Sequence, residues 1–262
     1  MAGASMARLR RWGPPAVLLA ALVGGWQTWV LVAHTPAYVL PSPARIAGAF
    51  VDSAPLLPGH VGATVLEAVG GLVVGAATGG ALAVLVASVP VARRTLEPLL
   101  VASQTIPMVV LAPLLALWFG IGVTPKIVVV ALITFFPVVV STTHGLTATD
   151  PELVDLVRSM GATHTKALTT VRFPAAVPAF FSGLRIAAAY AVAGAVIGEL
   201  VAGERGLGIF INRSRSSFRV DRIFVAVAVI SILSALLFAL VGAAARAASP
   251  WQHLDRLERE SS

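Results

Sequence analysis

The sequence contains no cysteine, which excludes disulfide frameworks, thiolate metal sites and cysteine nucleophiles. Charge is also scarce, because Asp, Glu, Lys and Arg make up 12% of the 262 residues, against about 25% in a typical soluble domain. Apolar residues reach 57%. A soluble fold cannot bury so much apolar surface and still present a charged exterior. The composition therefore predicts an integral membrane protein, and it excludes a nucleic-acid-binding domain.

Sequence motifs of enzyme chemistry are missing as well. The five histidines show no metal-ligand spacing, and the chain has no G-x-S-x-G nucleophile elbow. Neither lysine follows a glycine, as it would in a phosphate-binding loop. We therefore expect no catalytic residue, no metal site, and no binding of ATP by this chain alone.

Six apolar runs are long enough to cross a bilayer core of about 30 Å, which requires about 20 residues of helix. They predict an all-α polytopic protein that forms a single transmembrane domain over residues 1–262, with a core at 61–246. The first run is longer than the apolar part of a signal peptide, so we interpret 14–33 as a retained anchor helix. The six runs are 14–33, 68–92 (its helix starting near 61), 98–125, 127–149, 173–199 and 223–245.

The distribution of Lys and Arg predicts that both termini are cytoplasmic. With the N-terminus inside, the inner segments hold eleven of these residues and the outer loops hold seven. Five of the seven lie in one outer loop, between Arg205 and Arg222, and this loop opposes the general trend. The other long outer segment, 34–60, is predicted to contain a short amphipathic helix over 43–51, since proline is tolerated in a first helical turn.

Glycines spaced four residues apart mark two helix faces for close packing. Gly71, Gly75 and Gly79 share one face of the second span, and Gly194 and Gly198 share one face of the fifth. We interpret both faces as contacts with a neighbouring helix or subunit. The alternative is that they reflect only the Gly- and Ala-rich composition.

Three charged residues fall inside the apolar runs or at their ends, namely Glu67, Arg185 and Glu199. A charge at mid-membrane costs about 2.5–3.5 kcal/mol on insertion scales, so it usually has a structural or functional reason. Either these residues form ion pairs and interfacial anchors, or they line a translocation path.

Polar residues also precede a proline in the third span. Gln104 and Thr105 come shortly before Pro107, whose missing N–H predicts a kink there. Kinked polar stretches line pathways or make ordinary interhelical hydrogen bonds, and both readings stay open. The candidates for a translocation path are Gln104, Thr105, Arg185 and Glu199.

The inner segment 146–176 is predicted to form two short helices with a sharp turn between them. Asp150 is a suitable N-cap for a helix that begins at Pro151 and ends at Gly161. A second helix opens at 162–166 and is expected to end before Pro174. This shape fits a docking surface for another protein, and a loop lying on the membrane surface is the alternative.

This segment resembles the cytoplasmic signature of the permease subunits of bacterial ABC importers. The signature reads EAA, three residues, Gly, nine residues, then I-x-L-P. Here Asp155-Leu156-Val157 stands in the place of EAA, and Gly161 and Pro174 keep their spacing. Five further stretches resemble the branch of the family that handles nitrate, taurine, alkanesulfonates and thiamine-pyrimidine precursors. They are VLPSPARIAGAF (39–50), IPMVVLAPLLALWFGIGVTPKI (106–127), FFPVVVSTTHGL (135–146), PAAVPAFFSGLRIA (174–187) and GELVAGERGLGIFI (198–211).

The resemblance implies a type I ABC importer permease fold in the inner or plasma membrane. It implies a second permease chain, most simply an identical one, a cytoplasmic ATPase dimer that binds ATP and Mg²⁺, and an extracytoplasmic solute-binding protein. The solute would be a small anion or heterocycle. The residues it implies for coupling to the ATPase, within a coupling loop at 146–176, are Asp155, Gly161, Ala162, Thr163, His164 and Pro174.

Two other classes of function are weighed against this one. An ion-coupled secondary transporter would need an acidic residue deep within a span, whereas Glu67 and Glu199 lie near the ends of theirs. An intramembrane enzyme or a scaffold is the third class, and no nucleophile–base pair or metal cluster in the sequence supports an enzyme.

Overall fold

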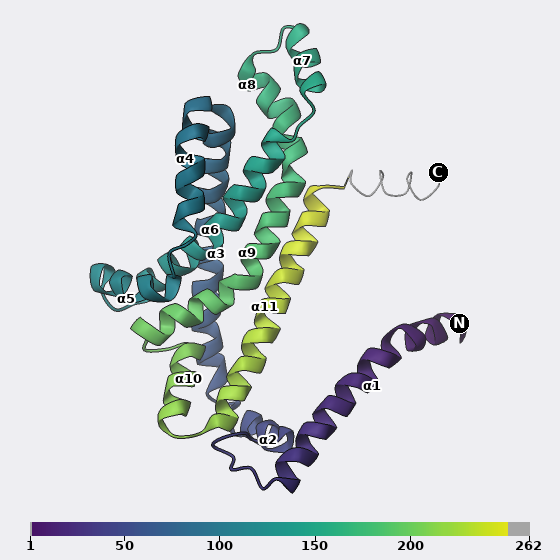
Figure 1. Ribbon diagram of the computed structural model, residues 1–262, viewed down its shortest axis with the longest axis vertical. Helices are drawn as coiled ribbons and strands as arrows, with labels where there is room; N and C mark the ends of the chain where they lie inside the picture. Colours follow the sequence, from purple (N-terminus) through teal and green to yellow (C-terminus); the bar gives the residue numbers. More distant parts are fainter. Residues whose placement is uncertain (1, 251–262) are drawn as a thin grey trace. The chain divides into compact units, whose positions relative to one another are not determined.

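The computed structural model describes residues 2–250, and the side chains of 13–89, 91–100 and 102–250. Over this range the chain forms helices and no strand (Figure 1), which confirms the all-α fold class. The elements are, in chain order, α1 (Ala2–Val32), α2 (Pro43–Ser53), α3 (Leu57–Ser88), α4 (Pro90–Ser103), α5 (Met108–Phe119), α6 (Val123–Thr147), α7 (Pro151–Ser159), α8 (His164–Ala167), the π-helix η1 (Leu168–Arg172), α9 (Phe173–Ala202), α10 (Leu207–Ser216) and α11 (Val220–Ala248).

These elements divide into two compact units. The first comprises Met1–Pro58 and Phe210–Val229, and the second comprises Gly59–Ile209 and Ile230–Ser262, in each case as far as the structure describes them. The expectation of one transmembrane domain over the whole chain stays a prediction.

The first unit is built around α2 and a buried carboxylate. Ser42 caps α2 by accepting a hydrogen bond from the Arg45 N–H at 3.3 Å, and α2 begins at Pro43, as the sequence predicts. Asp221 is 4% exposed, and it accepts hydrogen bonds from Arg219 Nε at 3.0 and 3.2 Å. Arg45 Nε lies 3.5 Å from the same carboxylate. At least one arginine of the 205–222 loop is therefore neutralised within its own unit.

Five helices of the described range are long and apolar enough to cross a membrane. Each corresponds to one of the six runs expected from the sequence. The stretches are Gly13–Val32, Leu57–Ser88, Val123–Thr147, His164–Ala202 and Val220–Ala248.

The remaining run, 98–125, is not one continuous helix. A helix already begins at Pro90, through residues expected to form a loop, and Arg93 and Glu97 form an i,i+4 ion pair on it at 3.4 Å. The chain then breaks at 104–107, because Pro107 has no N–H to continue a helix, and α5 follows with only 12 residues. The expected kink at Pro107 is thus a full break, and α5 runs across the direction of α4 (Figure 1).

The core of the second unit is formed by small residues on α3, α6, α9 and α11. Alanines dominate the α9 contribution, and this lets the helices approach one another closely. The fully or almost fully buried members are Ala68, Leu72, Val130, Val138, Ala187, Ala188, Ala191, Val192, Ala195 and Val241.

The glycine faces lie against α6. A Cβ built on Gly75 would stand 2.7 Å from the Ala131 carbonyl oxygen, and one on Gly79 would stand 2.9 Å from that of Phe135. A Cβ on Gly71 would collide with the Val130 side chain. From α9, Gly194 approaches Ile133 and Gly198 approaches Lys126 of the same helix. Helix α6 is therefore the element against which both glycine faces pack.

Candidate functional site

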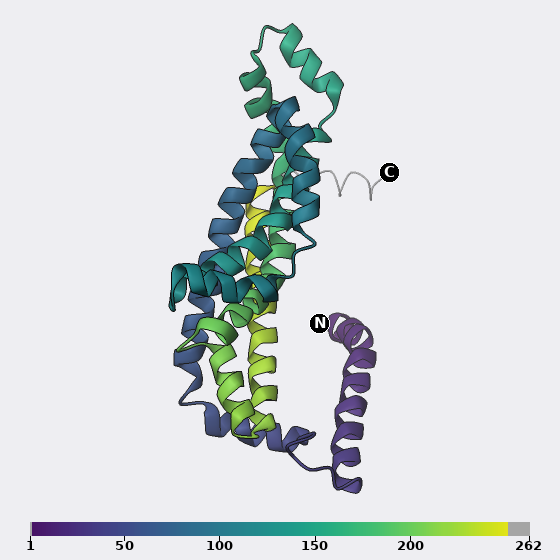
Figure 2. The same ribbon diagram turned by 60° about the vertical axis from the view of Figure 1, so that its left-hand side comes forward.

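The segment 146–176, which we call the coupling segment after the role that the family resemblance implies, projects beyond the packed helices of the second unit. In both Figure 1 and Figure 2, α7 and α8 lie past the ends of α6 and α9. The helical stretch His164–Ala202 has 39 residues, so it is about 58 Å long. A bilayer core is only about 30 Å thick, so this stretch is long enough for its polar start to lie outside the hydrocarbon.

Local capping fixes the first helix of the segment. Asp150 accepts a hydrogen bond from the Glu152 N–H at 2.9 Å, and Pro151 occupies the first helical turn, as predicted. Helix α7 ends at Ser159, and Gly161 follows with φ +89°, a backbone conformation that glycine adopts without strain. No atom lies within 4 Å of a Cβ built on Gly161. The turn therefore needs glycine for its conformation and not for space.

The chain re-enters a helix directly after this turn. Thr163 caps α8 by accepting a hydrogen bond from the Lys166 N–H at 3.2 Å. Ala162 is half-buried, whereas Thr163 and His164 are exposed. These residues form the outward corner of the segment.

The expected end of the second short helix before Pro174 is wrong. Helix α8 continues through the π-helix η1 into α9, with Pro174 in the first turn of α9. The N–H of Phe173 bonds to the carbonyl of Leu168, five residues earlier. This wider turn accommodates a residue that cannot donate, a local adjustment known in membrane helices. The corner is thus joined to α9 without a loop.

One face of α7 is apolar and exposed. Leu153, Leu156 and Met160 are 51%, 58% and 80% exposed and are spaced three and four residues apart. Val154 is buried at 6% and attaches the helix to the rest of the segment. Asp155 is exposed and lies beside the apolar stripe. Exposed leucine and methionine on a short polar helix are typical of a protein-docking surface.

A second feature is a buried polar cluster between α3, α6, α9 and the start of α10. Lys126 Nζ donates to Glu67 Oε1 at 2.6 Å, and the two residues are 4% and 1% exposed. Glu199 is fully buried and accepts from the Thr64 hydroxyl at 2.6 Å and from the Gly208 N–H at 2.5 Å. Buried charges of this kind require partners, and here each carboxylate has at least one.

The cluster also fixes the chain between α9 and α10. Thr64 Oγ1 accepts from the Leu207 N–H at 2.9 Å, and His60 Nδ1 lies 2.8 Å from the Gly206 carbonyl oxygen. Gly206 has φ +124°, and a Cβ there would collide with the Glu199 carboxylate. The Gly206-Leu207-Gly208 turn thus packs directly on Glu199.

The pairing of Glu67 with Lys126 was not predicted from the sequence. Lys126 is adjacent to Pro125, so it resembles a loop residue, but α6 already begins at Val123. The signal that could have found it is a lysine immediately ahead of an uninterrupted apolar run, since a buried lysine needs an acidic partner.

The candidates for a translocation path lie on different elements. Gln104 and Thr105 are exposed in the break between α4 and α5, where the Thr105 hydroxyl donates to the Ala102 carbonyl at 2.7 Å. Arg185 is exposed on α9, with its guanidinium 4.5 Å from the centre of the Phe238 ring. Glu199 belongs to the buried cluster. A role in translocation stays a prediction for all four.

The family profile described as "Binding-protein-dependent transport system inner membrane component" matches residues 56–253 of the chain. The chain belongs to this family. It is a permease subunit of an ABC importer, a multi-pass membrane component and not an enzyme.

Several relatives match over most of their length. The riboflavin transport system permease protein RibX of Chloroflexus aurantiacus is 39% identical over 92% of this chain and 90% of its own. The formylaminopyrimidine transport permease protein ThiX of Halalkalibacterium halodurans is 37% identical, over 82% of this chain and 86% of its own. The putative aliphatic sulfonates transport permease protein SsuC of Bacillus subtilis is 27% identical, over 92% of this chain and 88% of its own.

Solved structures support the same fold. A chain of the MetNI methionine ABC transporter in an inward-facing conformation superposes with a TM-score of 0.60 and 21% identity. The match covers 74% of this permease and 95% of that chain. The type I permease fold expected from the sequence is consistent with this likeness.

Proposed function

We propose that the coupling segment docks into a cytoplasmic ATPase and transmits its movement to α9. The observation that carries this proposal is the exposed stripe formed by Leu153 and Leu156 of α7 and by its C-cap residue Met160. Burial of a leucine or methionine side chain contributes about 1.5–3 kcal/mol, so the stripe would supply much of the binding energy. Asp155 and the corner residues Gly161–His164 would lie at the edge of the contact.

The continuity from α8 through η1 into α9 supports transmission of movement. A displacement of the corner cannot be absorbed by a flexible loop, because the structure has none between His164 and Ala202. It would instead move α9, which packs on α6 through Gly194 and Gly198. ATP binding would then favour one of two arrangements of the helices, as alternating access requires.

The test is co-purification of the ATPase with the full-length permease. Leu156→Gln combined with Met160→Gln should weaken ATPase binding about tenfold or more. Arg158→Gln, on the opposite face of α7, is the matched control and should bind as the wild type does. Equal binding by the stripe variant and the control would disprove docking through this stripe.

A second test addresses the turn. Gly161→Ala and Gly161→Val place a Cβ on a residue with φ +89° and should impair coupled uptake. Gly161→Asn should impair uptake least, because asparagine is enriched at positive φ. A series in which loss of uptake follows side-chain volume, with no advantage for asparagine, would contradict the conformational role.

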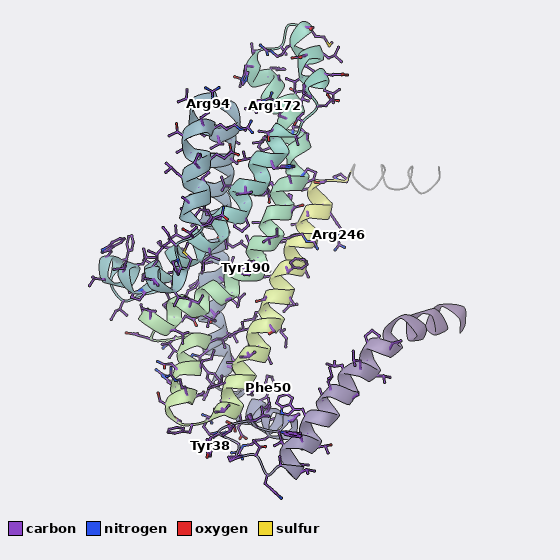
Figure 3. All side chains as sticks on the ribbon, in the orientation of Figure 1. Tyr38, Phe50, Arg94, Arg172, Tyr190 and Arg246 are labelled. Atoms are coloured by element: carbon purple, nitrogen blue, oxygen red, sulfur yellow. The ribbon has the colours of Figure 1, made fainter. Side chains whose placement is uncertain are left out.

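The proposed role requires a defined orientation in the membrane and a defined set of partners. Both termini and the coupling segment face the cytoplasm, and Arg94 and Arg172 lie near the end of the second unit that carries this segment (Figure 3). Two permease chains, most simply identical, form the path. A solute-binding protein delivers the solute from outside, and the ATPase dimer holds ATP and Mg²⁺.

The solute is proposed to be a small heterocycle. The relatives at 39% and 37% identity are named for riboflavin and formylaminopyrimidine, and the one named for aliphatic sulfonates is 27% identical. Uptake by vesicles that contain the permease, its ATPase and its binding protein should be competed by flavins or pyrimidines better than by alkanesulfonates. Competition by sulfonates alone would favour the anionic class. Uptake driven by an ion gradient without ATP would favour a secondary transporter.

A further inference from the structure

An open cavity lies between α9 and α11, within the second unit. It has a volume of about 600 Å³. The cavity is lined by one face of α9 and one face of α11, because the lining residues of each helix recur at spacings of three and four positions. The lining residues that matter here are Ser182 and Arg185 of α9 and Gly242, Arg246 and Ser249 of α11.

The charged groups that line this cavity are hydrogen-bond donors. Arg185 and Arg246 bring two guanidinium groups, and neither forms an ion pair with another residue in the described part of the chain. The Ser249 hydroxyl is buried, with the residue 4% exposed, and it has no hydrogen-bond partner within that range. No described carboxylate lines the cavity. Two arginines without ion pairs, and a buried unpartnered hydroxyl three residues after Arg246, indicate that a ligand with acceptor atoms belongs there.

Helix register places the two arginines at different depths. Arg185 is twelve residues after Phe173, so it lies about 18 Å along α9 from the start of that helix. Arg246 lies in the last turn of α11 (Figure 3). The Phe238 ring holds the Arg185 guanidinium at 4.5 Å. Gly242 lies beside the Arg185 guanidinium, because a Cβ built on it would stand 3.5 Å from Arg185 Nε. The absence of a side chain at Gly242 therefore keeps the space next to the guanidinium open.

We propose that this cavity, which we call the α9–α11 anion pocket, binds an oxyanion through Arg185, Arg246 and Ser249. A guanidinium offers several N–H donors in a fixed plane that match the oxygens of phosphate or sulfonate. A tetrahedral oxyanion presents acceptors in several directions, as two arginines from different helices and a hydroxyl require. The site does not depend on the coupling segment or on the identity of the transported heterocycle.

Two sources of this chemistry are open to the pocket, and the experiment separates them. Basic pockets between membrane helices on the cytoplasmic side bind anionic lipid head groups. A soluble phosphate or sulfonate that enters from water would use the same donors. In the first arm, the full chain is placed in nanodiscs of phosphatidylcholine containing 30% phosphatidylglycerol, and the lipid that remains bound after transfer to detergent is measured by native mass spectrometry. In the second arm, inorganic phosphate or ethanesulfonate is added as a competitor.

Wild type should retain phosphatidylglycerol over phosphatidylcholine, and Arg185→Gln or Arg246→Gln should each reduce that preference about fivefold. Arg246→Lys should keep part of it. Arg94→Gln removes an exposed arginine of the second unit that does not line the pocket, and it is the control for general surface charge. Gly242→Leu fills the pocket without changing charge and should also abolish the preference.

Retention of lipid that soluble anions do not displace supports the pocket and assigns a lipid head group to it. Displacement by millimolar phosphate or ethanesulfonate, together with loss in the arginine variants, supports the pocket and assigns a soluble oxyanion. The proposal is overturned if the preference for phosphatidylglycerol is the same as that of Arg94→Gln in all three pocket variants, Arg185→Gln, Arg246→Gln and Gly242→Leu. Each variant is first checked for an unchanged size-exclusion profile, and Arg246→Lys and Ser249→Ala replace any that fails.

Discussion

Lys126→Met is the change for which the structure makes the sharpest prediction. Lys126 Nζ lies 2.6 Å from Glu67 Oε1, and the two side chains are 6% and 1% exposed. The other oxygen of Glu67, Oε2, is buried and has no hydrogen-bond partner within the described chain. Replacing the lysine with methionine keeps the volume but leaves the carboxylate without its cation.

The expected cost is about 3–5 kcal/mol, the range found when one partner of a buried ion pair is removed. The same reasoning predicts rescue. Glu67→Leu combined with Lys126→Met removes both charges and should restore most of the lost stability, because apolar pairs of similar volume often match a buried ion pair. The rescue separates a charge effect from a packing defect.

The measurement is the free energy of unfolding of the full-length permease in mixed micelles, taken from denaturant titration followed by circular dichroism. Arg93→Met is the matched control, because it breaks the exposed Arg93–Glu97 ion pair at 3.4 Å. Exposed ion pairs contribute about 0–1 kcal/mol, so this variant should unfold almost as the wild type does. If Lys126→Met cost no more than Arg93→Met, the pair would not be buried in the folded protein and the argument would be refuted.

Two further predictions use the same assay. Gly75→Ala places a Cβ 2.7 Å from the Ala131 carbonyl oxygen and should destabilise by about 1–3 kcal/mol, whereas Gly62→Ala, on the same helix with nothing within 4 Å, should be neutral or slightly stabilising. Equal effects of the two would contradict close packing at Gly75. Thr64→Val removes the donor to Glu199 and the acceptor for the Leu207 N–H, so it should cost about 1–3 kcal/mol per unsatisfied group. Thr78→Val is the control and should change the free energy of unfolding little, because the exposed Thr78 hydroxyl bonds only to carbonyls of its own helix. A loss of stability as large as that of Thr64→Val would argue against the buried cluster.

Properties that depend on local sequence were predicted well. Five of the six spans, the cap at Asp150 and the start of α2 at Pro43 follow from hydrophobic runs and from the conformational limits of a few residues. The family resemblance rests on such segments, which explains why it could be stated before any coordinates. The arginines of 8–11 and 256–259, which support a cytoplasmic location of both termini, lie outside the residues whose side chains the structure describes.

Properties that depend on tertiary context were not predicted. The break at 104–107 was foreseen only as a kink, because the extent to which a proline interrupts a helix depends on what packs around it. The continuation of α8 into α9 was missed because the rule against helix before proline does not foresee a π-turn. The pairing of Glu67 with Lys126 joins residues 59 positions apart. A local pattern can mark Lys126 as a lysine that needs an acidic partner, but it cannot identify Glu67 as that partner.

The unbroken helical stretch from His164 to Ala202 carries a polar corner at its beginning and Glu199 near its end. Glu199 in turn holds Thr64 of α3 and the backbone of Gly208. A shift of this stretch along its axis would therefore strain the hydrogen bonds that Glu199 makes near its other end. Either these hydrogen bonds break, or α3 and the start of α10 move together with α9.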